Sequence, residues 1–465
     1  MAVATDIDPL TLALQPPPGE TPQAREARLQ QEQEAKKRSD LIDEELNRQR
    51  NAEKKSVKSV KLLLLGQSES GKSTTLKNFQ LINSPKSFKA ERTSWRAVVH
   101  LNVVRSIRLI IEALSEAEAC ASSTDTAGPD DPVYPELNPD LLALKMRLLP
   151  LQQVEMTLFG MLTHGAQFKH DAPDEGPNRA EIVVNSATPW KNAFSRLISN
   201  VRNSFEGPDV NESQDSREAR QLLHACSEYM IRLWNDPIVK QVLKVHRLRL
   251  EDMAGFFLDS IERVSALSYE PTDDDILRAR LKTIGVSEHQ FSLKAGNMVP
   301  RNWIVYDVGG ARSLRAAWVP YFDSMHAIIF LAPLSCFDQV LAEDDRVNRL
   351  EDSILLWKII VSSPLLKNTN LILFLNKCDI LRAKLASGQK FREYVTSYGD
   401  RPNDFENCSQ YLKRKFSGIA KQYSPEPRAF YTYFTSVIDS QSTSDILGSV
   451  QDTLIRQDLG KNQLL

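Results

Sequence analysis

The chain has 465 residues, 42% of them apolar, which is enough for two or three domains with a sizeable core. Its formal net charge of −2 argues against a general polyanion binder, because nucleic-acid-binding proteins usually carry a basic surplus. Five scattered cysteines favour reduced thiols over a disulfide framework. There is no membrane-spanning apolar run and no secretory signal, and Ala2 stands where N-myristoylation requires glycine. We therefore expect a cytoplasmic protein without direct membrane insertion.

The N-terminal region has two compositions. Residues 1–22 are rich in proline and predict a disordered tail. Residues 23–56 contain neither proline nor glycine and are dominated by charged and amide side chains, which predicts a long helix. A thin apolar stripe runs through Leu41, Ile42 and Leu46. A solvated helix and a helix that docks on a partner both fit this pattern.

The rest of the chain predicts an α/β fold that is split in two. Short apolar runs alternate with helical patterns in residues 57–84 and 273–465, which favours a mostly parallel sheet wrapped by helices. Residues 85–272 have helical periodicity and predict an inserted all-helical domain with an enlarged polar loop near 119–139. The expected helices of the insert span 94–118, 140–165, 190–206, 216–246 and 250–266. The expected strands span 57–65, 303–308, 327–332, 370–375 and 429–435.

A phosphate-binding motif follows the first expected strand. Residues 66–73 read GQSESGKS and match G-x-x-x-x-G-K-[ST] in full, between a strand and a helix as the motif requires. Backbone N–H groups and the helix N-terminus surround the phosphates in such a loop. Lys72 would reach the terminal phosphates, and the Ser73 hydroxyl would bind Mg²⁺. A chance match on a Gly/Ser-rich turn is the alternative interpretation.

A second motif favours guanine as the base. Residues 376–379 read NKCD and follow the apolar run 371–375. Asp379 can accept two hydrogen bonds from the guanine N1–H and 2-amino group, which adenine does not offer. Lys377 can lie over the ring, and Asn376 can tie this loop to the phosphate loop. The motif is short, but together with a phosphate loop it favours GTP over ATP.

Two further segments carry candidate magnesium and γ-phosphate groups. The sequence DVGG runs from Asp307 to Gly310 after another expected strand. The aspartate can hold a magnesium-bound water, and the glycine N–H can approach a γ-phosphate because no side chain intervenes. Upstream, residues 275–283 read DILRARLKT. Thr283 can supply a second magnesium hydroxyl, and Arg280 can offset charge on the phosphoryl group.

Taken together, these segments resemble the α subunits of heterotrimeric G proteins, from about Glu34 to Leu465. The motifs that carry the resemblance are KLLLLG at 61–66, ESGKST at 69–74, LRARLKT at 277–283, DVGG at 307–310, LAED at 341–344 and FLNK at 374–377. The resemblance implies a P-loop GTPase domain interrupted by the helical domain just before the catalytic arginine. It also implies a GTP-binding transducer with GTPase activity and Mg²⁺.

Partners are implied by the same resemblance. The charged N-terminal helix would lie against a Gβγ dimer, and the last helix would face a seven-helix receptor. The protein would couple that receptor to downstream effectors, and we expect no nucleic-acid partner. Association with the inner face of the plasma membrane would come through these partners.

The resemblance assigns the site residues. The candidate catalytic residues are Arg280 and its partner Glu69. The candidate metal ligands are Ser73 and Thr283, with Asp307 acting through water. The candidate nucleotide-binding residues are Glu69, Ser70, Gly71, Lys72, Ser73, Thr74, Leu277, Arg278, Thr283, Asp307, Gly310, Asn376, Lys377, Asp379 and Val437.

The sequence departs from the family at the catalytic centre. The family's DVGGQR reads DVGGAR here, with Ala311 in place of the glutamine that orients the attacking water. A methyl group neither donates nor accepts a hydrogen bond, so it cannot replace that glutamine. Ser68 stands where the family has glycine, and a side chain there crowds the γ-phosphate. We expect GTP to bind and to be hydrolysed slowly.

Other departures concern partners and the base pocket. Ala316 and Ala317 replace basic residues before Trp318, which weakens the expectation of Gβγ contact. The guanine loop at 435–438 reads TSVI instead of TCAT, and we expect its backbone N–H contact to the base to persist. The C-terminal cysteine of family members is absent.

Three functions compete with a timed switch. A GTP-locked scaffold without a turnover cycle is favoured by Ala311 and Ser68. A pseudo-GTPase that binds no nucleotide is opposed by Lys72 and Asp379, which are both retained. An ATP-using P-loop kinase is opposed by the NKCD motif. The seven histidines lack metal-ligand spacing, so we expect no transition-metal site.

Overall fold

The computed structural model describes residues 21–55, 59–122, 134–163, 183–185, 214–246, 248–284, 286–293, 301–322, 325–341 and 343–462. The chain divides into two compact units, residues 1–59 and 60–465. The predicted tail up to residue 20, most of the predicted loop near 119–139 and the predicted helix at 190–206 lie outside the described residues.

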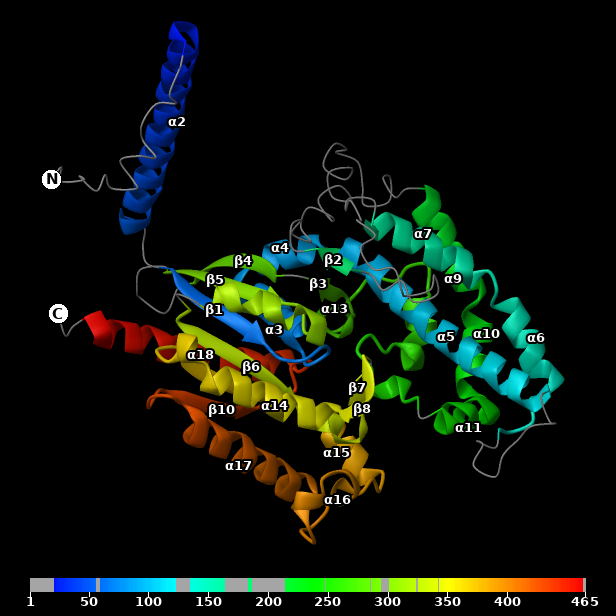
Figure 1. Cartoon of the computed structure of the whole chain (residues 1–465). Helices are drawn as coiled ribbons and strands as arrows, with labels where there is room; N and C mark the ends of the chain where they lie inside the picture. The colour runs from blue at the N-terminus through cyan, green and yellow to red at the C-terminus, as the bar shows by residue number, and fades with distance from the viewer. Residues whose placement is uncertain are drawn as a thin grey trace, which may run out of the picture. The chain divides into compact units, whose positions relative to one another are not determined.

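The described residues of the first unit form a long helix, α2, from Pro22 to Lys55 (Figure 1). It lies where the sequence predicts a charged helix. The apolar stripe is solvent-facing in this unit, since Leu41 and Ile42 are 65% and 59% exposed. Burial of such a stripe requires a partner surface, because exposed apolar side chains gain nothing from the hydrophobic effect.

A six-stranded sheet forms the centre of the second unit, in the order β10-β9-β6-β1-β5-β4. Its strands are β1 (Val60–Leu65), β4 (Val286–Leu293), β5 (Arg301–Val308), β6 (Ala327–Pro333), β9 (Asn370–Asn376) and β10 (Phe430–Phe434). Neighbouring strands are parallel except β4, which runs antiparallel to β5. This arrangement confirms the predicted α/β class.

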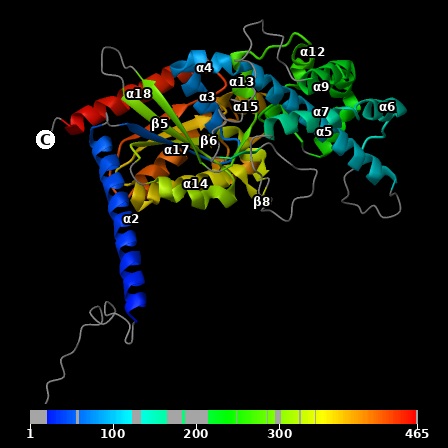
Figure 2. The ribbon, with the colours of Figure 1, turned by 90° about the horizontal axis from the view of Figure 1, so that it is seen from above.

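The leucine run of β1 explains why the sheet is buried on both faces. Leu62 and Leu64 belong to one core, which also contains Leu76 of α3 (Lys72–Asn83) and Leu447 of α18 (Ser440–Asn462). The alternate leucines of the strand belong to the opposite core, which contains residues of α14 (Arg349–Ser362), α15 (Cys378–Ala386) and α17 (Phe405–Tyr423). Successive strand side chains point to opposite faces, so a continuous apolar run suits a central parallel strand. Figure 2 shows α3 and α18 on one side of the sheet and α14 on the other.

The second face of the sheet is covered by the remaining elements of the C-terminal half. The helices are α14 (Arg349–Ser362), α15 (Cys378–Ala386), α16 (Phe391–Tyr394) and α17 (Phe405–Tyr423), with the shorter η4 (Arg312–Tyr321), η5 (Leu334–Asp338), η6 (Pro364–Leu366) and η7 (Thr396–Tyr398). A small ribbon pairs β7 (Val340–Leu341) with β8 (Asp344–Asn348). Trp357 of α14 is fully buried, and its indole N–H donates to the Phe416 carbonyl of α17 at 2.9 Å.

The inserted segment has a core of its own, built around the 31-residue helix α5 (Arg92–Ser122). The helices packed with it are α4 (Pro85–Ala90), α6 (Pro139–Arg147), α7 (Leu151–Thr163), α9 (Gln214–Ala225), α10 (Ser227–Asn235), α11 (Pro237–Val245), α12 (Ile261–Val264) and α13 (Asp273–Arg278). Pro150 and Pro237 mark breaks in two segments that the sequence predicts as continuous, because proline lacks the N–H that a helix interior needs. A short strand, β2 (Val183–Asn185), pairs in parallel with β3 (Lys282–Ile284).

The prediction of one helix over residues 250–266 is wrong. The structure has two short turns there, η2 (Leu250–Asp252) and η3 (Leu258–Ser260), before α12 begins. Gly255 has a φ of 82°, and a Cβ on it would lie 2.7 Å from Asn102 Oδ1 and 2.9 Å from Arg280 Cβ. Residues 250–260 therefore do not form a continuous helix, because the chain at Gly255 passes closely between Asn102 of α5 and Arg280.

Asp275 organises the turn that precedes Arg278 and Arg280. Its side chain is 4% exposed and pairs with both terminal nitrogens of Arg263 at 2.7 Å. It also accepts from Tyr269 and from the Thr272 backbone N–H, which completes a capping box at the start of α13. Burial opposes ionisation of the carboxyl, but these hydrogen bonds outweigh it and lower the pKa from 3.8 to about 2.

Replacing Asp275 with asparagine should lower the free energy of unfolding at pH 7 by roughly 2 kcal/mol, the linkage value of this pKa shift. Because the folded pKa is depressed, the contribution is complete above the unfolded pKa of 3.8 and is lost as the pH falls towards 2. Urea unfolding at pH 7 and pH 3 should show a smaller difference between wild type and variant at the lower pH. The exposed neighbour Asp274 provides the control, Asp274→Asn, and an equal loss in both variants would contradict the assignment.

Among the described residues, none of the helices combines the length and apolarity that a bilayer crossing requires.

Candidate nucleotide site

A cavity of about 760 Å³ lies at the carboxyl edge of the parallel strands. In an α/β sheet this edge gathers the loops that follow successive strands, and ligands bind there. The loops after β1, β5, β9 and β10 all contribute to the lining, together with residues 251–256 and 277–281 from the insert and its return to the sheet. Motifs that are hundreds of residues apart in the sequence therefore surround one space.

The phosphate loop wraps around the side chain of Lys72. Its ammonium group donates to the carbonyl oxygens of Gly66 at 2.9 Å and Gln67 at 2.6 Å. Burial lowers the pKa of Lys72 to about 8, although the nearby Asp307 carboxylate acts in the opposite direction. Bound phosphates would add negative charge beside the ammonium and favour its protonated form.

The start of α3 depends on a glycine. Gly71 has a φ of 103°, and a Cβ on it would lie 2.4 Å from the Asn376 amide nitrogen. Only glycine allows the guanine motif to approach the phosphate loop so closely. The first backbone N–H groups of a helix have no acceptor within the helix itself, and the N-terminus of α3 is thereby directed at the cavity.

The candidate magnesium ligands are hard oxygen donors. The Ser73 hydroxyl donates to Asp307 Oδ2 at 2.7 Å, so the hydroxyl and the carboxylate converge on one point of the cavity. A hydroxyl and a carboxylate are ligands that Mg²⁺ accepts, which makes this donor set a fit for the ion. Thr283 lies in β3, but its side chain is outside the described parts of the structure.

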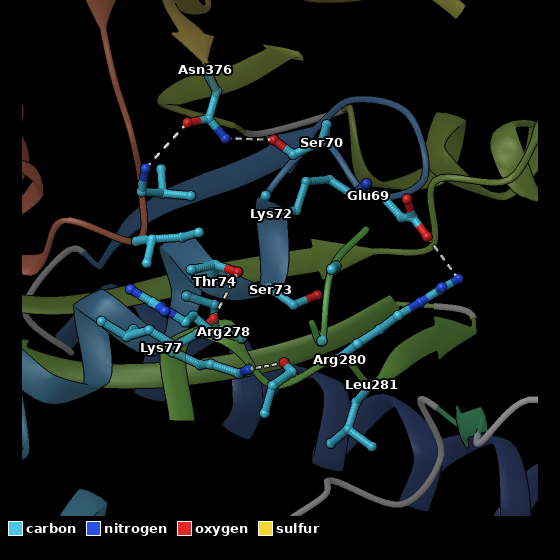
Figure 3. A pocket seen from close by; sticks show the side chains of 18 of the residues that line it. Glu69, Ser70, Lys72, Ser73, Thr74, Lys77, Arg278, Arg280, Leu281 and Asn376 are labelled. Carbon is cyan, nitrogen blue, oxygen red and sulfur yellow. Dashed lines mark hydrogen bonds and ion pairs between the residues drawn. The ribbon is translucent and has the colours of Figure 1, made fainter. Parts of the chain in front are cut away.

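The guanine motif is tied to both neighbouring loops by Asn376. Its amide nitrogen donates to the Ser70 carbonyl at 2.7 Å (Figure 3). Its amide oxygen accepts from the Thr435 hydroxyl at 3.1 Å and the Val437 N–H at 3.2 Å. Lys377 and Asp379 line the cavity beside it. The Val437 N–H, which the sequence analysis expected to contact the base, is thus directed at Asn376 in this structure.

Arg280 faces the phosphate loop across the cavity. Its guanidinium pairs with the Glu69 carboxylate at 2.8 Å (Figure 3). Its backbone is held from the insert, since the Asn102 side chain accepts from the Arg280 N–H at 2.7 Å and donates to its carbonyl at 3.1 Å. Leu277 and Arg278 also line the cavity, and the Leu277 carbonyl accepts from the Thr74 hydroxyl at 3.4 Å.

Lys77 of α3 bonds to the chain just before Arg280. It is buried, donates to the carbonyls of Ile276 at 2.8 Å and Ala279 at 2.7 Å, and lies over the Trp95 ring. Burial lowers its pKa to about 7, against the opposing charge of Asp307. The position of Arg280 is therefore set by two side chains, Asn102 and Lys77, which the sequence analysis did not select.

Sequence reasoning also missed a polar cluster behind the phosphate loop. Its members are Gln67, Arg315, Arg349 and Asp352. Gln67 occupies one of the variable positions of the phosphate-loop motif, where the pattern itself makes no prediction. The only sequence signal was that a polar residue stands two positions after the apolar run of β1.

Fold and site together define a P-loop GTP-binding protein. The sequence profile of the family described as "G-protein alpha subunit" matches residues 36–454. The chain belongs to this family, whose members bind guanine nucleotide, act as GTPases and serve in signal transduction.

Individual relatives support the assignment over nearly the whole chain. A guanine nucleotide-binding protein alpha-4 subunit of Mycosarcoma maydis is 32% identical, covering 97% of this chain and 94% of its own length. An alpha-1 subunit of Saccharomyces cerevisiae is 30% identical, covering 92% and 95%. An alpha-4 subunit of Caenorhabditis elegans is also 30% identical, covering 92% and 96%.

Proposed function

We propose that this chain is a GTP-binding signal transducer whose bound GTP turns over slowly. The observation that carries the proposal is a nucleotide cavity with its binding groups assembled but with Ala311 at its γ-phosphate end. Ala311 directly follows Gly310 and has no side-chain donor or acceptor. The cavity therefore has the groups needed to bind GTP. It lacks the glutamine side chain that would orient the attacking water for hydrolysis.

Two polar side chains of this region, Gln67 and His289, are engaged with other protein groups. The Gln67 amide donates to the Arg349 carbonyl and to Asp352, so it is turned away from the cavity. His289 lines the cavity and lies 3.1 Å from the Ser287 hydroxyl, although neither residue has the amide geometry of glutamine. Ser68 adds a hydroxymethyl group at the phosphate end of the cavity. These features favour retention of GTP over its hydrolysis.

Each binding residue has a separate task in the proposed reaction. Lys72 and the loop N–H groups hold the phosphates, while Ser73, Thr283 and Asp307 would hold Mg²⁺. The ion supplies charge neutralisation on the phosphate oxygens when it is bound. Arg280, oriented by Glu69, offsets the charge that develops on the transferred phosphoryl group. Asp379 selects guanine.

Partner contacts follow from family membership and from exposed surfaces. The exposed stripe of α2 is suited to a Gβγ-type partner, while Ala316 and Ala317 in η4 reduce the charge available for that contact. The family also implies a seven-helix receptor at the C-terminal helix and a downstream effector. Association with the inner face of the plasma membrane would then occur through these proteins.

A GTP-locked scaffold is the second candidate function. It is favoured by the same two residues, Ser68 and Ala311, and it differs from a slow switch only in the lifetime of the bound nucleotide. A scaffold would keep its bound GTP for much longer than an ordinary family member takes to hydrolyse GTP and exchange the product. A slow switch would still hydrolyse its GTP and release phosphate without a partner protein.

The deciding experiment measures nucleotide identity and turnover. The purified protein should contain GTP, and single-turnover hydrolysis of labelled GTP with Mg²⁺ should be about a hundredfold slower than for a family member with glutamine at this position, since one positioned polar group contributes about that factor. Co-purified GDP with hydrolysis at the family rate would refute the proposal. Absence of any bound or bindable nucleotide would refute both candidate functions.

A further inference from the structure

Gln67 connects the phosphate loop to helix α14. Its side chain is 1% exposed, and its amide nitrogen donates one hydrogen bond to the Arg349 carbonyl at 2.9 Å and another to Asp352 Oδ2. Both amide hydrogens are thus used by α14. The amide oxygen accepts no hydrogen bond within the described part of the chain. The contact is therefore directed at α14 and not at the nucleotide cavity.

Asp352 also contacts residues 309–318, which we call the switch segment, through Arg315. Its two carboxylate oxygens accept from the Arg315 guanidinium at 3.0 and 2.6 Å. The Arg315 and Asp352 side chains are 18% and 7% exposed, so solvent weakens this bidentate pair little. Burial opposes ionisation of Asp352, but hydrogen bonds from Arg315 and Gln67 outweigh it and keep the pKa below its usual range.

The switch segment also touches the phosphate loop through its backbone. A Cβ on Gly310 would lie 2.4 Å from the Gln67 carbonyl carbon and 2.4 Å from the Ser68 nitrogen. The Trp318 indole folds back and donates to the Gly309 carbonyl at 3.0 Å. Both ends of the segment are therefore held near the Gln67–Ser68 peptide.

Arg349 strengthens the same junction from the other side. Its guanidinium donates to the Ser68 carbonyl at 2.8 Å and to Gln339 Oε1 at 2.8 Å. The side chain of Gln67 and the backbone of Ser68 are consequently both bonded to the first turn of α14. All of these partners are protein groups, so none of the bonds requires a γ-phosphate.

We propose that Gln67 is a positioning residue that keeps Asp352 oriented towards Arg315 in both nucleotide states, so that the switch segment stays ordered with GDP as well as with GTP. This inference rests on the proposed function, because it concerns the nucleotide response of the same site. Order that does not depend on the γ-phosphate removes the structural difference on which partner discrimination normally relies. The chain would then present an active-type surface whichever nucleotide it holds.

The test is amide hydrogen exchange of the switch segment in the full-length protein, loaded with GDP or with a non-hydrolysable GTP analogue. Wild type should exchange at nearly the same rate in both states. In Gln67→Met the GDP form should exchange about tenfold faster while the GTP-analogue form is unchanged, since one hydrogen bond to a charged group is lost. Trp318 emission, with Trp318→Phe as the blank, should change between nucleotides only in the variant.

Gln339→Met is the matched control, because it makes the same chemical change beside Arg349 without touching Asp352. It should exchange like wild type. A double variant, Gln67→Met with Arg315→Met, should lose no more order than Arg315→Met alone, since the two residues act through one carboxylate. Gln67→Ala serves if the methionine variant does not fold.

The outcomes separate the two proposals. Nucleotide binding by every variant, with equal exchange in wild type and Gln67→Met, would overturn the role of Gln67 and leave the proposed function standing. A tenfold nucleotide response already present in wild type would also overturn it. Failure of the wild-type protein to bind either nucleotide would overturn both.

Discussion

The double substitution Ala311→Gln and Ser68→Gly should raise the single-turnover rate of GTP hydrolysis about a hundredfold, which is the factor expected from one positioned polar group. Ala311 begins the turn into η4, with φ −63° and ψ 146°, so a longer side chain needs no change of backbone region there. The glycine removes the hydroxymethyl group at the phosphate end of the cavity and leaves room for the amide. Rapid-quench measurement of labelled phosphate release follows the reaction.

The single variants and a shorter amide provide the controls. Ala311→Gln alone should recover part of the rate, and Ser68→Gly alone should recover little, because it restores space without a group that orients water. Ala311→Asn has the same amide on a shorter stem and should remain slow. Fast hydrolysis by the wild-type protein, unchanged in every variant, would mean that another group positions the water and that the proposed cause of slow turnover is incorrect.

Replacing Asp379 with asparagine should weaken GTP binding by about a thousandfold, because one of two hydrogen bonds to a charged acceptor is lost and the other becomes a weaker bond to a neutral oxygen. An asparagine amide presents one acceptor and one donor, whereas guanine offers two donors at this edge. Xanthine has an oxygen in place of the 2-amino group, so the variant should bind xanthosine triphosphate better than GTP. Competition between the two nucleotides, read by equilibrium binding, measures the change.

The reversed preference distinguishes base recognition from general damage. Lys72→Met serves as the comparison, since loss of the phosphate ammonium should weaken GTP and xanthosine triphosphate by similar factors. If Asp379→Asn lost affinity for both nucleotides equally, Asp379 would be a structural residue of the loop and not the group that reads the base.

The elements that the sequence predicted best are those in which local chemistry decides structure. The leucine run of β1, the phosphate loop after it and the charged helix α2 all lie where their patterns placed them. Each depends on neighbours in sequence: an apolar run, a glycine-bounded turn or a stretch without helix breakers. The alternation of strand and helix patterns also predicted the split of the α/β domain, which the sheet order supports because β1 lies between β5 and β6.

Prediction was poorest where two distant segments meet. The segment 250–266 has helical periodicity, but Gly255 lies against Asn102 and Arg280, and close packing there prevents a continuous helix. The edge strand β4 carries polar side chains such as Glu288 and Gln290, so its pattern is weak, and it forms because β5 offers a free edge.

The sequence by itself determined the class of ligand, the P-loop fold and the missing glutamine, because these depend on residue types within short motifs. Only the tertiary structure decided how the motifs are held together. Asn102 and Lys77 position the backbone around Arg280, and Gln67 joins the phosphate loop to Asp352, across separations of 178 to 285 residues. No local pattern encodes such partners, since a buried amide or ammonium is satisfied by whatever groups the fold brings within hydrogen-bonding distance.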